Sequence, residues 1–274
     1  MTAPPPRRPL VMGIVNVTPD SFSDGGRFAG ADAARNHALA LLEQGADLLD
    51  VGGESARPGA EPVGEAEELD RVMPVIEAVR AARPEAAISI DTMKPAVARS
   101  AIGAGAVLWN DVNALRSEGA LEAAAELNCT VCLMHMQGEP RSMQAEPAYE
   151  NVVAEIARYL GQRAGAAMAA GVARGDILLD PGIGFGKTLD HNLQIMAALD
   201  HFVSLGFPIL FGASRKRFIQ GLDESASEPA DRLGGSLAAA LHAARSGCAI
   251  LRVHDVRETV QALKVQAAIT STSP

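Results

Sequence analysis

The chain has 274 residues, 48% of them hydrophobic and 21% charged, which is typical of a soluble globular protein with one large or two small domains. The formal net charge of −9 and the lack of a basic stripe argue against a general binder of nucleic acid or anionic membranes. No apolar stretch reaches the roughly 20 residues that span a bilayer, and no signal-peptide core follows the N-terminus, so we expect a cytoplasmic protein with no membrane association.

Eight short apolar runs recur along the chain, and several are continuous, as expected for parallel strands buried on both faces. The predicted strands are Leu10–Val15, Leu48–Val51, Ala86–Ile90, Val107–Trp109, Thr130–Met134, Ile177–Leu179, Pro208–Phe211 and Ala249–Val253. The three cysteines, an odd number, argue against a disulfide framework. Cys129 and Cys132 are spaced to lie on opposite faces of the fifth strand, where we expect two small buried side chains.

Amphipathic segments separate these runs, and glycine or proline marks several of their ends. The predicted helices are Asp32–Gln44, Glu65–Ala82, Pro95–Ile102, Glu118–Leu127, Tyr149–Ala170, Leu189–Leu205, Pro229–Arg245 and Val256–Ile269. Eight strand–helix units predict a (β/α)8 TIM barrel of the α/β class, a single domain over residues 10–269 with flexible tails at 1–9 and 270–274. A doubly wound open sheet is the alternative, but no G-x-G-x-x-G follows the first strand.

Polar or charged residues stand at the end of nearly every predicted strand. They include Asn16, Asp50, Asp91, Asn110, His135, Asp180, Ser214, Lys216, Arg252 and His254. In a closed barrel these ends meet at one mouth, where barrel enzymes build their active sites. A set of solvated loop residues is the alternative interpretation.

The segment that begins at Asp180, DPGIGFGKT, resembles a phosphate-binding P-loop. Pro181 stands in the place of the first glycine and has no N–H to offer a phosphate, which disfavours an NTPase. The Asp180 carboxylate can instead accept two N–H donors from a pterin or guanine edge. Asp91 and Asn110 are candidates for the same heterocycle, although Asp91 could also cap the helix that begins at Pro95.

Cationic residues at other strand ends predict an anion site. Arg215, Lys216 and Arg217 are consecutive, and in an acidic chain we expect them to meet an anion; a solvated basic turn is the alternative. Arg252 and His254 alternate with Val253, so both can face one side of the eighth strand. In a closed barrel that strand adjoins the first, which ends in Asn16, and the three residues together predict a diphosphate site.

Eight motifs now identify a family resemblance. They are MGIVNVTPDSFSDGG, DVGGESARPGA, SIDTMKP, WNDV, LMHMQGEP, LLDPGIGFGK, GASRKRFI and LRVHDV. In this order they resemble the dihydropteroate synthase family, over the chain from about Leu10 to about Ile269. The resemblance implies an enzyme of folate synthesis that condenses (7,8-dihydropterin-6-yl)methyl diphosphate with para-aminobenzoate, giving 7,8-dihydropteroate and diphosphate. It further implies competition by sulfonamides and a homodimer.

The resemblance also implies roles for individual residues. The pterin would be held by Asp91, Asn110, Met134, Asp180, Phe185 and Lys216. The diphosphate would meet Asn16, Arg57, Arg252 and His254, with Mg²⁺ bound to Asn16. The para-aminobenzoate pocket would comprise Phe22, Pro58, Phe185, Ser214, Lys216 and Arg217. Catalysis would rest on Asn16, Arg252, His254 and Lys216, and we expect a structural role for His135.

The loop after the first strand, Thr18–Gly26, is expected to act as a mobile lid, with Phe22 covering the second substrate once diphosphate has bound. Two positions depart from the family pattern: Ala56 replaces a typical Thr, which puts diphosphate binding or loop closure in doubt, and Ile183 replaces a frequent Phe. Two alternatives remain open. A methyltetrahydrofolate-dependent methyltransferase would need no diphosphate site, and a non-catalytic pterin-binding homologue would catalyse no reaction.

Overall fold

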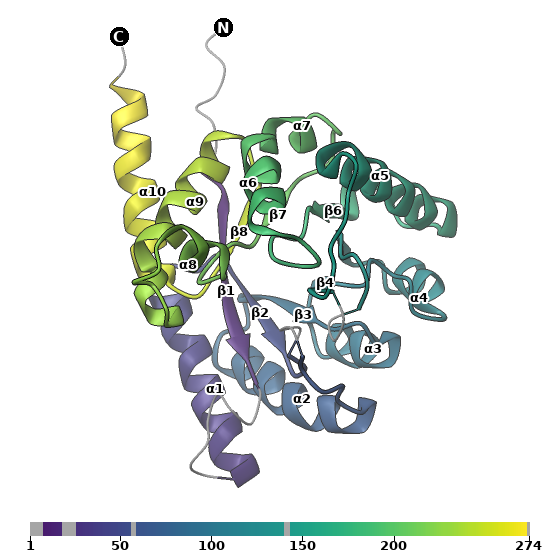
Figure 1. Cartoon of the computed structure of the whole chain (residues 1–274). Coiled ribbons are helices and arrows are strands. Elements are labelled where there is room, and N and C mark those ends of the chain that lie inside the picture. Colours follow the sequence, from purple (N-terminus) through teal and green to yellow (C-terminus); the bar gives the residue numbers. More distant parts are fainter. Residues whose placement is uncertain (1–7, 18–25, 56–58, 140–142, 273–274) are drawn as a thin grey trace, which may run out of the picture.

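The computed structural model describes residues 8–17, 26–55, 59–139 and 143–272, and the side chains of residues 26–29 are outside this description. Eight parallel strands form one sheet in the order β6-β5-β4-β3-β2-β1-β8-β7, with helices around it (Figure 1). The strands are β1 (Leu10–Asn16), β2 (Leu48–Gly52), β3 (Ala87–Asp91), β4 (Leu108–Asp111), β5 (Thr130–Met134), β6 (Ile177–Asp180), β7 (Leu210–Phe211) and β8 (Ile250–Val253). The predicted (β/α)8 TIM barrel is thereby confirmed.

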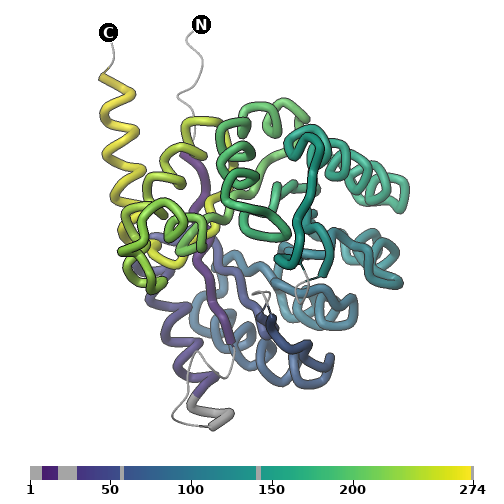
Figure 2. Tube along the Cα trace, viewed as in Figure 1, coloured from purple at the N-terminus to yellow at the C-terminus, as the bar shows by residue number. Residues whose placement is uncertain are grey.

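The helices alternate with the strands along the chain. They are α1 (Gly26–Glu43), α2 (Glu65–Ala82), α3 (Pro95–Gly103), α4 (Ala120–Leu127), α5 (Val152–Ala170), α6 (Leu189–Ala197), α7 (Leu199–Val203), α8 (Phe218–Leu222), α9 (Leu233–Arg245) and α10 (Val256–Ser271), with 3-10 turns η2 (Arg174–Asp176) and η3 (Pro229–Arg232). The last helix, α10, packs beside the first strand, β1, so the first and last elements of the fold are neighbours (Figure 2).

The barrel closes weakly between β6 and β7. Leu179 and Ile209 form a single parallel bridge, and the Leu179 N–H donates to the carbonyl of Pro208 at 3.0 Å. Pro208 has no backbone N–H that could donate a hydrogen bond to β6, which limits strand pairing at this seam. The adjacent strand β7 has only two residues, so the seam is the shortest edge of the barrel.

Apolar side chains bury both faces of the strands. A layer inside the barrel consists of Met12, Leu48, Leu108, Cys132, Leu178, Leu210 and Ile250. A larger cluster, which includes Leu49, Val51 and Ile88, fills the space between the strands and the surrounding helices. Cys129 lies in this outer cluster and Cys132 in the inner layer, both as free thiols, which confirms that they occupy opposite faces.

The predicted strands agree with the observed ones to within about two residues at each end, whereas several helical segments differ. Helix α1 begins at Gly26 rather than at Asp32. The predicted helix Leu189–Leu205 is broken at Ala198, whose φ of −111° and ψ of 24° are not helical, and no Gly or Pro marks this break in the sequence. The predicted helix Pro229–Arg245 begins as the 3-10 turn η3, and the short helix α8 was not predicted.

Described structure continues past both ends of the predicted domain, residues 10 and 269. At the C-terminus, α10 continues to Ser271, so Thr270 and Ser271 belong to the helix. At the N-terminus, the guanidinium of Arg8 donates to both carboxylate oxygens of Asp47, at 2.7 and 2.8 Å. Among the helices in the described ranges, none is long and apolar enough to cross a membrane.

The outer cluster predicts how substitutions affect stability. Leu49 is completely buried between β2 and the helices, so Leu49→Ala should lower the free energy of unfolding by about 2–5 kcal/mol, through lost burial and the cavity that remains. Val107 is 50% exposed, and Val107→Ala should change the free energy of unfolding by less than about 1 kcal/mol. Urea denaturation measures both values, and equal losses would contradict this placement of the core.

Candidate active site

A polar layer lies above the apolar layer inside the barrel, nearer the C-terminal ends of the strands. Side chains two positions apart on a strand face the same side, so each inward-facing apolar residue predicts the direction of the residue two places later. The successive pairs are Leu48 and Asp50, Leu108 and Asn110, Leu178 and Asp180, and Ile250 and Arg252. Polar residues that were predicted at the mouth therefore also line the barrel interior.

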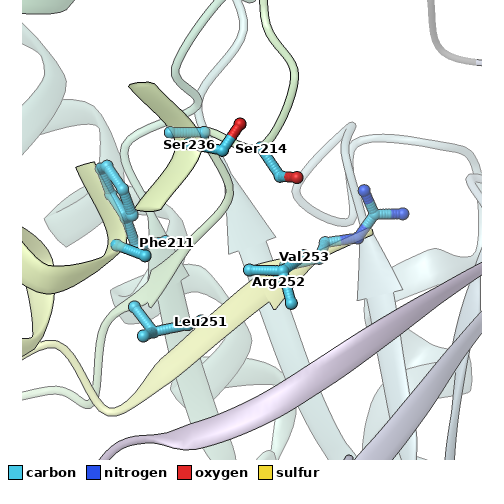
Figure 3. Close-up of a pocket in the computed structure, with 8 residues that line it drawn as sticks. Phe211, Ser214, Ser236, Leu251, Arg252 and Val253 are labelled. Atoms are coloured by element: carbon cyan, nitrogen blue, oxygen red, sulfur yellow. The ribbon is translucent and has the colours of Figure 1, made fainter. Parts of the chain in front are cut away.

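Arg252 is the central contact of this polar layer. Its Nε donates to Oδ2 of Asp50 at 2.6 Å, and its Nη2 donates to Oδ2 of Asp91 at 2.7 Å. These carboxylates stand on β2 and β3, with β1 between them and β8, so the guanidinium reaches across the interior. Figure 3 shows it pointing away from Phe211 and Leu251, consistent with alternation along β8. One cation thus joins three strands.

Asp50 is a site residue to which the sequence alone assigned no role. Its Oδ2 accepts hydrogen bonds from Arg252 and from Nδ2 of Asn110, the latter at 3.0 Å. The side chain is fully buried, and its Oδ1 has no hydrogen-bond partner among the described residues. The available signal was a carboxylate inside an apolar strand, in register with the inward-facing Leu48. Asp50 holds both Arg252 and Asn110 in the polar layer.

Ionisable groups of this layer have altered pKa values. Burial raises the pKa of Asp91 to about 7; the Arg252 guanidinium opposes the shift, whereas the negative charge of Asp50 adds to it. Burial lowers the pKa of Lys216 to about 8, and the charge of Asp180 opposes that shift. Such perturbed groups gathered inside a barrel are typical of functional sites.

Asp180, Lys216 and Phe185 lie on the opposite side of the interior from Asp50. Burial raises the pKa of Asp180, an effect that the charge of Lys216 opposes. The ammonium of Lys216 donates to the carbonyl of Ile183 and lies 4.6 Å from the centre of the Phe185 ring. Phe185 also packs against an apolar cluster at the mouth, formed by Val112, Met134, Met136 and Met143 with Met93. Acidic, amide and cationic side chains of the polar layer therefore lie beside this apolar cluster.

The segment after β6, residues 181–187, folds against the end of β5 with very little space between the two backbones. Gly182 has a φ of +70°, and a Cβ atom there would lie 2.0 Å from the carbonyl oxygen of His135. Gly186 has a φ of +62°, and its Cβ would lie 2.5 Å from the carbonyl oxygen of Gln137. Only glycine fits both positions. These glycines therefore serve close backbone packing rather than the phosphate cradle of a P-loop.

His135 is unsuited to act as a general base. Its Nδ1 lies 3.0 Å from Nζ of the buried Lys187 and accepts a hydrogen bond from it. Burial and then the positive charge of Lys187 lower the pKa of His135 to about 3, so the imidazole stays neutral at physiological pH. The Lys187 contact and this pKa favour the structural role expected for His135.

The consecutive cations Arg215, Lys216 and Arg217 point to three different environments, which corrects the expectation that they meet one anion. Arg215, whose φ is +58°, donates from Nε and Nη2 to the carboxylate of Asp255 at 3.0 and 2.5 Å. Lys216 turns into the barrel, and Arg217 is exposed. Only Lys216 of the three joins the polar layer.

Asn16 and His254 lie nearer the mouth than Arg252. In the pairing of β1 with β8, Met12 stands opposite Arg252, so Asn16 is four residues further along. Asn16 is half-buried at the end of β1, opposite Gly52 of β2. The backbone N–H of His254 donates to Oγ of Ser214 at 3.2 Å, and its Nδ1 lies 3.0 Å from the same oxygen. The strands adjoin as predicted, with Asn16 placed above Arg252.

The loop after β2 is anchored at its base by charged residues. Arg71 donates from Nη1 to the carbonyl of Gly53 at 2.7 Å. Lys94 forms ion pairs with Glu54 and with the fully buried Glu68. The next residues of this loop, Ala56, Arg57 and Pro58, lie outside the described residues, as does most of the predicted lid at Thr18–Gly26, with Phe22.

The side chains present do not form a closed metal site. Among the described residues, no group of three or more His, Cys, Asp or Glu could hold a metal ion. Asn16 offers a neutral amide oxygen, and Mg²⁺ is usually bound by one or two protein ligands together with substrate phosphates and water. An amide oxygen of this kind can serve as one such ligand beside substrate phosphates.

Comparison with known proteins agrees with this geometry. A family model described as pterin binding enzyme matches residues 12–254. The dihydropteroate synthase of Escherichia coli (strain K12) is 51% identical over 263 residues, which cover 96% of the chain and 92% of that protein. Sequence similarity therefore extends over the whole barrel.

Solved structures show the same similarity. Dihydropteroate synthase of Xanthomonas albilineans with 4-aminobenzoic acid has a TM-score of 0.91 and 51% identity, covering 97% of this chain and 94% of that one. The Xanthomonas enzyme has also been solved with 7,8-dihydropteroate, at a TM-score of 0.88 and 49% identity, covering 97% and 95%. The Yersinia pestis dihydropteroate synthase, in a sulfonamide drug complex, has a TM-score of 0.90 and 49% identity, again covering 97% and 95%.

The neutral state of His135 predicts a loss of stability in acid. An unfolded histidine has a pKa near 6.5, whereas that of folded His135 is about 3, so between these values only the unfolded chain takes up the proton. Lowering the pH from 7 to 5 should therefore cost about 1–2 kcal/mol of folding free energy through this residue. His135→Asn should abolish that contribution in urea denaturation at the two pH values.

The control for this experiment is His201→Asn, because His201 is exposed on α7. This substitution should leave the pH dependence as it is in the unaltered protein. If His135→Asn and the unaltered protein lost equal stability between pH 7 and 5, the buried neutral state of His135 would be wrong.

Proposed function

The chain belongs to the dihydropteroate synthase family of pterin-binding enzymes, which transfer a pterin-methyl group, and on that premise we propose that it condenses (7,8-dihydropterin-6-yl)methyl diphosphate with para-aminobenzoate. The products are 7,8-dihydropteroate and diphosphate. The observation that carries the proposal is the polar layer of buried Asn110 and Asp180 with half-buried Asp91, bordered by Met134 and Phe185. It offers hydrogen bonds at the edges of a flat heterocycle and apolar contact on its faces.

Pterin recognition rests first on Asp180. One carboxylate oxygen, Oδ1, accepts the Gly182 N–H at 2.7 Å, which fixes the side chain. Each carboxylate oxygen has more than one acceptor position, so the two N–H donors of the amino-pyrimidinone edge still have partners. Asn110 supplies both a donor and an acceptor, and Asp91 accepts at the other end of the ring. Lys216 donates near Asp180, beside the face of Phe185.

The diphosphate lies toward the mouth, above the pterin ring. Arg252 reaches up from the polar layer, and His254 and Asn16 stand nearer the mouth at the ends of β8 and β1. Arg57 of the second loop adds a further cation. The Asn16 amide oxygen would hold a Mg²⁺ ion, which would supply positive charge beside the leaving diphosphate. These groups stabilise negative charge where it develops in the transition state.

The reaction is a dissociative, SN1-like substitution at the pterin methylene carbon. The carbon–oxygen bond to diphosphate breaks, and its electron pair leaves with the diphosphate. The electron-rich dihydropterin stabilises the positive charge left on the methylene. The neutral aryl amine then forms the carbon–nitrogen bond and loses its proton. This route requires no covalent bond to the protein, so His135 can remain a structural residue.

The para-aminobenzoate pocket is proposed at the mouth beside Ser214, Lys216 and Phe185, with exposed Arg217 at its rim. Phe22 and Pro58 of the first two loops complete it. The Yersinia pestis relative was solved in a sulfonamide drug complex, which supports sulfonamides as competitors of the second substrate here. The predicted homodimer, the cytoplasmic location and the lack of nucleic-acid or membrane partners stay predictions.

The direct test is an assay of the purified protein with both substrates and Mg²⁺. We expect 7,8-dihydropteroate and diphosphate in equal amounts, and removing Mg²⁺ with a chelator should abolish most of the turnover. Asp180→Asn should weaken pterin binding by about 1–3 kcal/mol, because a charge-assisted hydrogen-bonded pair is lost. Calorimetry with 6-hydroxymethyl-7,8-dihydropterin measures that change.

The control is Asp200→Asn, at an exposed position on α7, which should bind the pterin as the unaltered protein does. Pterin binding without product would favour the non-catalytic homologue, and methyl transfer from methyltetrahydrofolate would favour the methyltransferase. Either result would refute the proposed condensation.

A further inference from the structure

Lys187 is a buried lysine that has no part in the proposed reaction. It is only 3% exposed, although lysine is rarely buried without partners. Its Nζ donates to Nδ1 of His135 at 3.0 Å, to the carbonyl of His135 at 3.3 Å and to the carbonyl of Phe185 at 2.9 Å. An ammonium has three N–H donors, and each has one of these acceptors. No donor remains for a substrate.

These three acceptors belong to two segments that both supply predicted pterin contacts. His135 follows Met134 at the end of β5, and Phe185 lies in the segment after β6 that begins at Asp180. The backbone N–H of His135 also donates to the carbonyl of Asp180, at 3.0 Å. Lys187 therefore connects the two backbones directly behind Met134, Asp180 and Phe185.

Neighbouring contacts leave this segment little freedom except at its tip. Gly184 donates its N–H to Oδ1 of Asn192 at 2.7 Å, and Tyr149 donates its hydroxyl to the carbonyl of Gly186 at 2.8 Å. Between these anchors, Phe185 is held at its carbonyl by Lys187. The position of the Phe185 ring beside the Lys216 ammonium thus rests on two contacts, from Lys187 to its carbonyl and from its own N–H to the carbonyl of Gly182 at 3.2 Å.

We propose that Lys187 is a positioning residue of the pterin site, which acts through His135 and the Phe185 carbonyl to fix the Phe185 ring against the bound heterocycle. This inference rests on the proposed function, because it assumes that Phe185 packs on a pterin. It explains the Gly186-Lys187-Thr188 end of the segment without a nucleotide. The lysine holds the protein's own carbonyls where a P-loop lysine would hold phosphates.

The hydrogen-bond donors and the length of the Lys187 side chain are both required. A methionine side chain in its place would match the length but donate nothing, which would leave two carbonyls and a ring nitrogen without a donor in a buried place. His135 matters through Nδ1, which an asparagine amide oxygen can replace in nearly the same position. A leucine side chain in place of His135 would remove that acceptor at similar volume. These substitutions distinguish the effect of losing the hydrogen bonds from the effect of changing side-chain packing.

The experiment compares Lys187→Met, His135→Asn and His135→Leu with the unaltered protein. The probe is 6-hydroxymethyl-7,8-dihydropterin, which carries the ring without diphosphate, with its Kd measured by calorimetry. Lys187→Met and His135→Leu should raise this Kd about tenfold to a hundredfold, because small displacements of positioning groups have large effects. His135→Asn should stay within about threefold of the unaltered protein, since the acceptor is retained.

A kinetic measurement separates positioning from loss of structure. In Lys187→Met, the KM for the pterin substrate should rise while the KM for para-aminobenzoate, at saturating pterin substrate, stays within about twofold. Lys264→Met, at an exposed position on α10, is the matched control and should change neither constant. Equal increases in both KM values, with a lowered melting temperature, would mean that Lys187 only supports the fold.

The remaining outcomes also decide the proposal. If Lys187→Met fails to fold, the His135 pair decides: equal pterin affinity in His135→Asn and His135→Leu would overturn it. Unchanged pterin affinity in Lys187→Met would do the same. If the unaltered protein binds the ring but forms no product, the proposed function fails while the positioning role is still measured by Kd. If the unaltered protein does not bind the ring, both proposals fall together.

Discussion

The ion pairs that Arg252 makes with Asp50 and Asp91 inside the barrel are the interaction on which the rest of the site depends. Buried charges are costly unless they are paired and hydrogen-bonded, and removing one partner leaves the others uncompensated. The structure meets this condition by drawing the partners from different strands, so the charges are satisfied only when β8, β2 and β3 have come together in the sheet. Asn110 completes the arrangement through Asp50. Pairing of these strands thus also assembles this part of the site.

Arg252 also links the two halves of the proposed reaction. Its guanidinium contacts Asp91, a carboxylate proposed to bind the pterin, and Arg252 lies below Asn16 at the mouth, where the diphosphate would lie. Because burial raises the pKa of Asp91 to about 7, the cation that opposes this shift keeps the carboxylate ready to accept a hydrogen bond. Electrostatic stabilisation is strongest where such groups are fixed before the substrate arrives. The Lys187 contact with the Phe185 carbonyl likewise fixes the apolar side of the site before a substrate binds.

Periodicity and composition were enough to predict the barrel, because continuous apolar runs such as Leu48–Val51 suit strands buried on both faces. Strand ends also identified Asp91, Asn110, Asp180 and Arg252 as site residues. Partner choice could not be predicted, since it depends on which distant residue comes close in three dimensions. Arg215 pairs with Asp255, which has no periodic relation to it, and Lys187 contacts His135 from a different loop. Asp50 also stood among the strand-end residues but received no role, because a carboxylate in a strand has no local feature that separates a site residue from a core ion pair.

A crystal structure of the protein with 7,8-dihydropteroate bound would test most directly the central claim, that the buried polar layer is the pterin site. We expect the heterocycle inside the barrel, within hydrogen-bond distance of Asp91, Asn110 and Asp180, with the Phe185 ring against one face. A ligand bound outside the barrel mouth, with the Arg252 ion pairs and these three side chains untouched by it, would contradict the account.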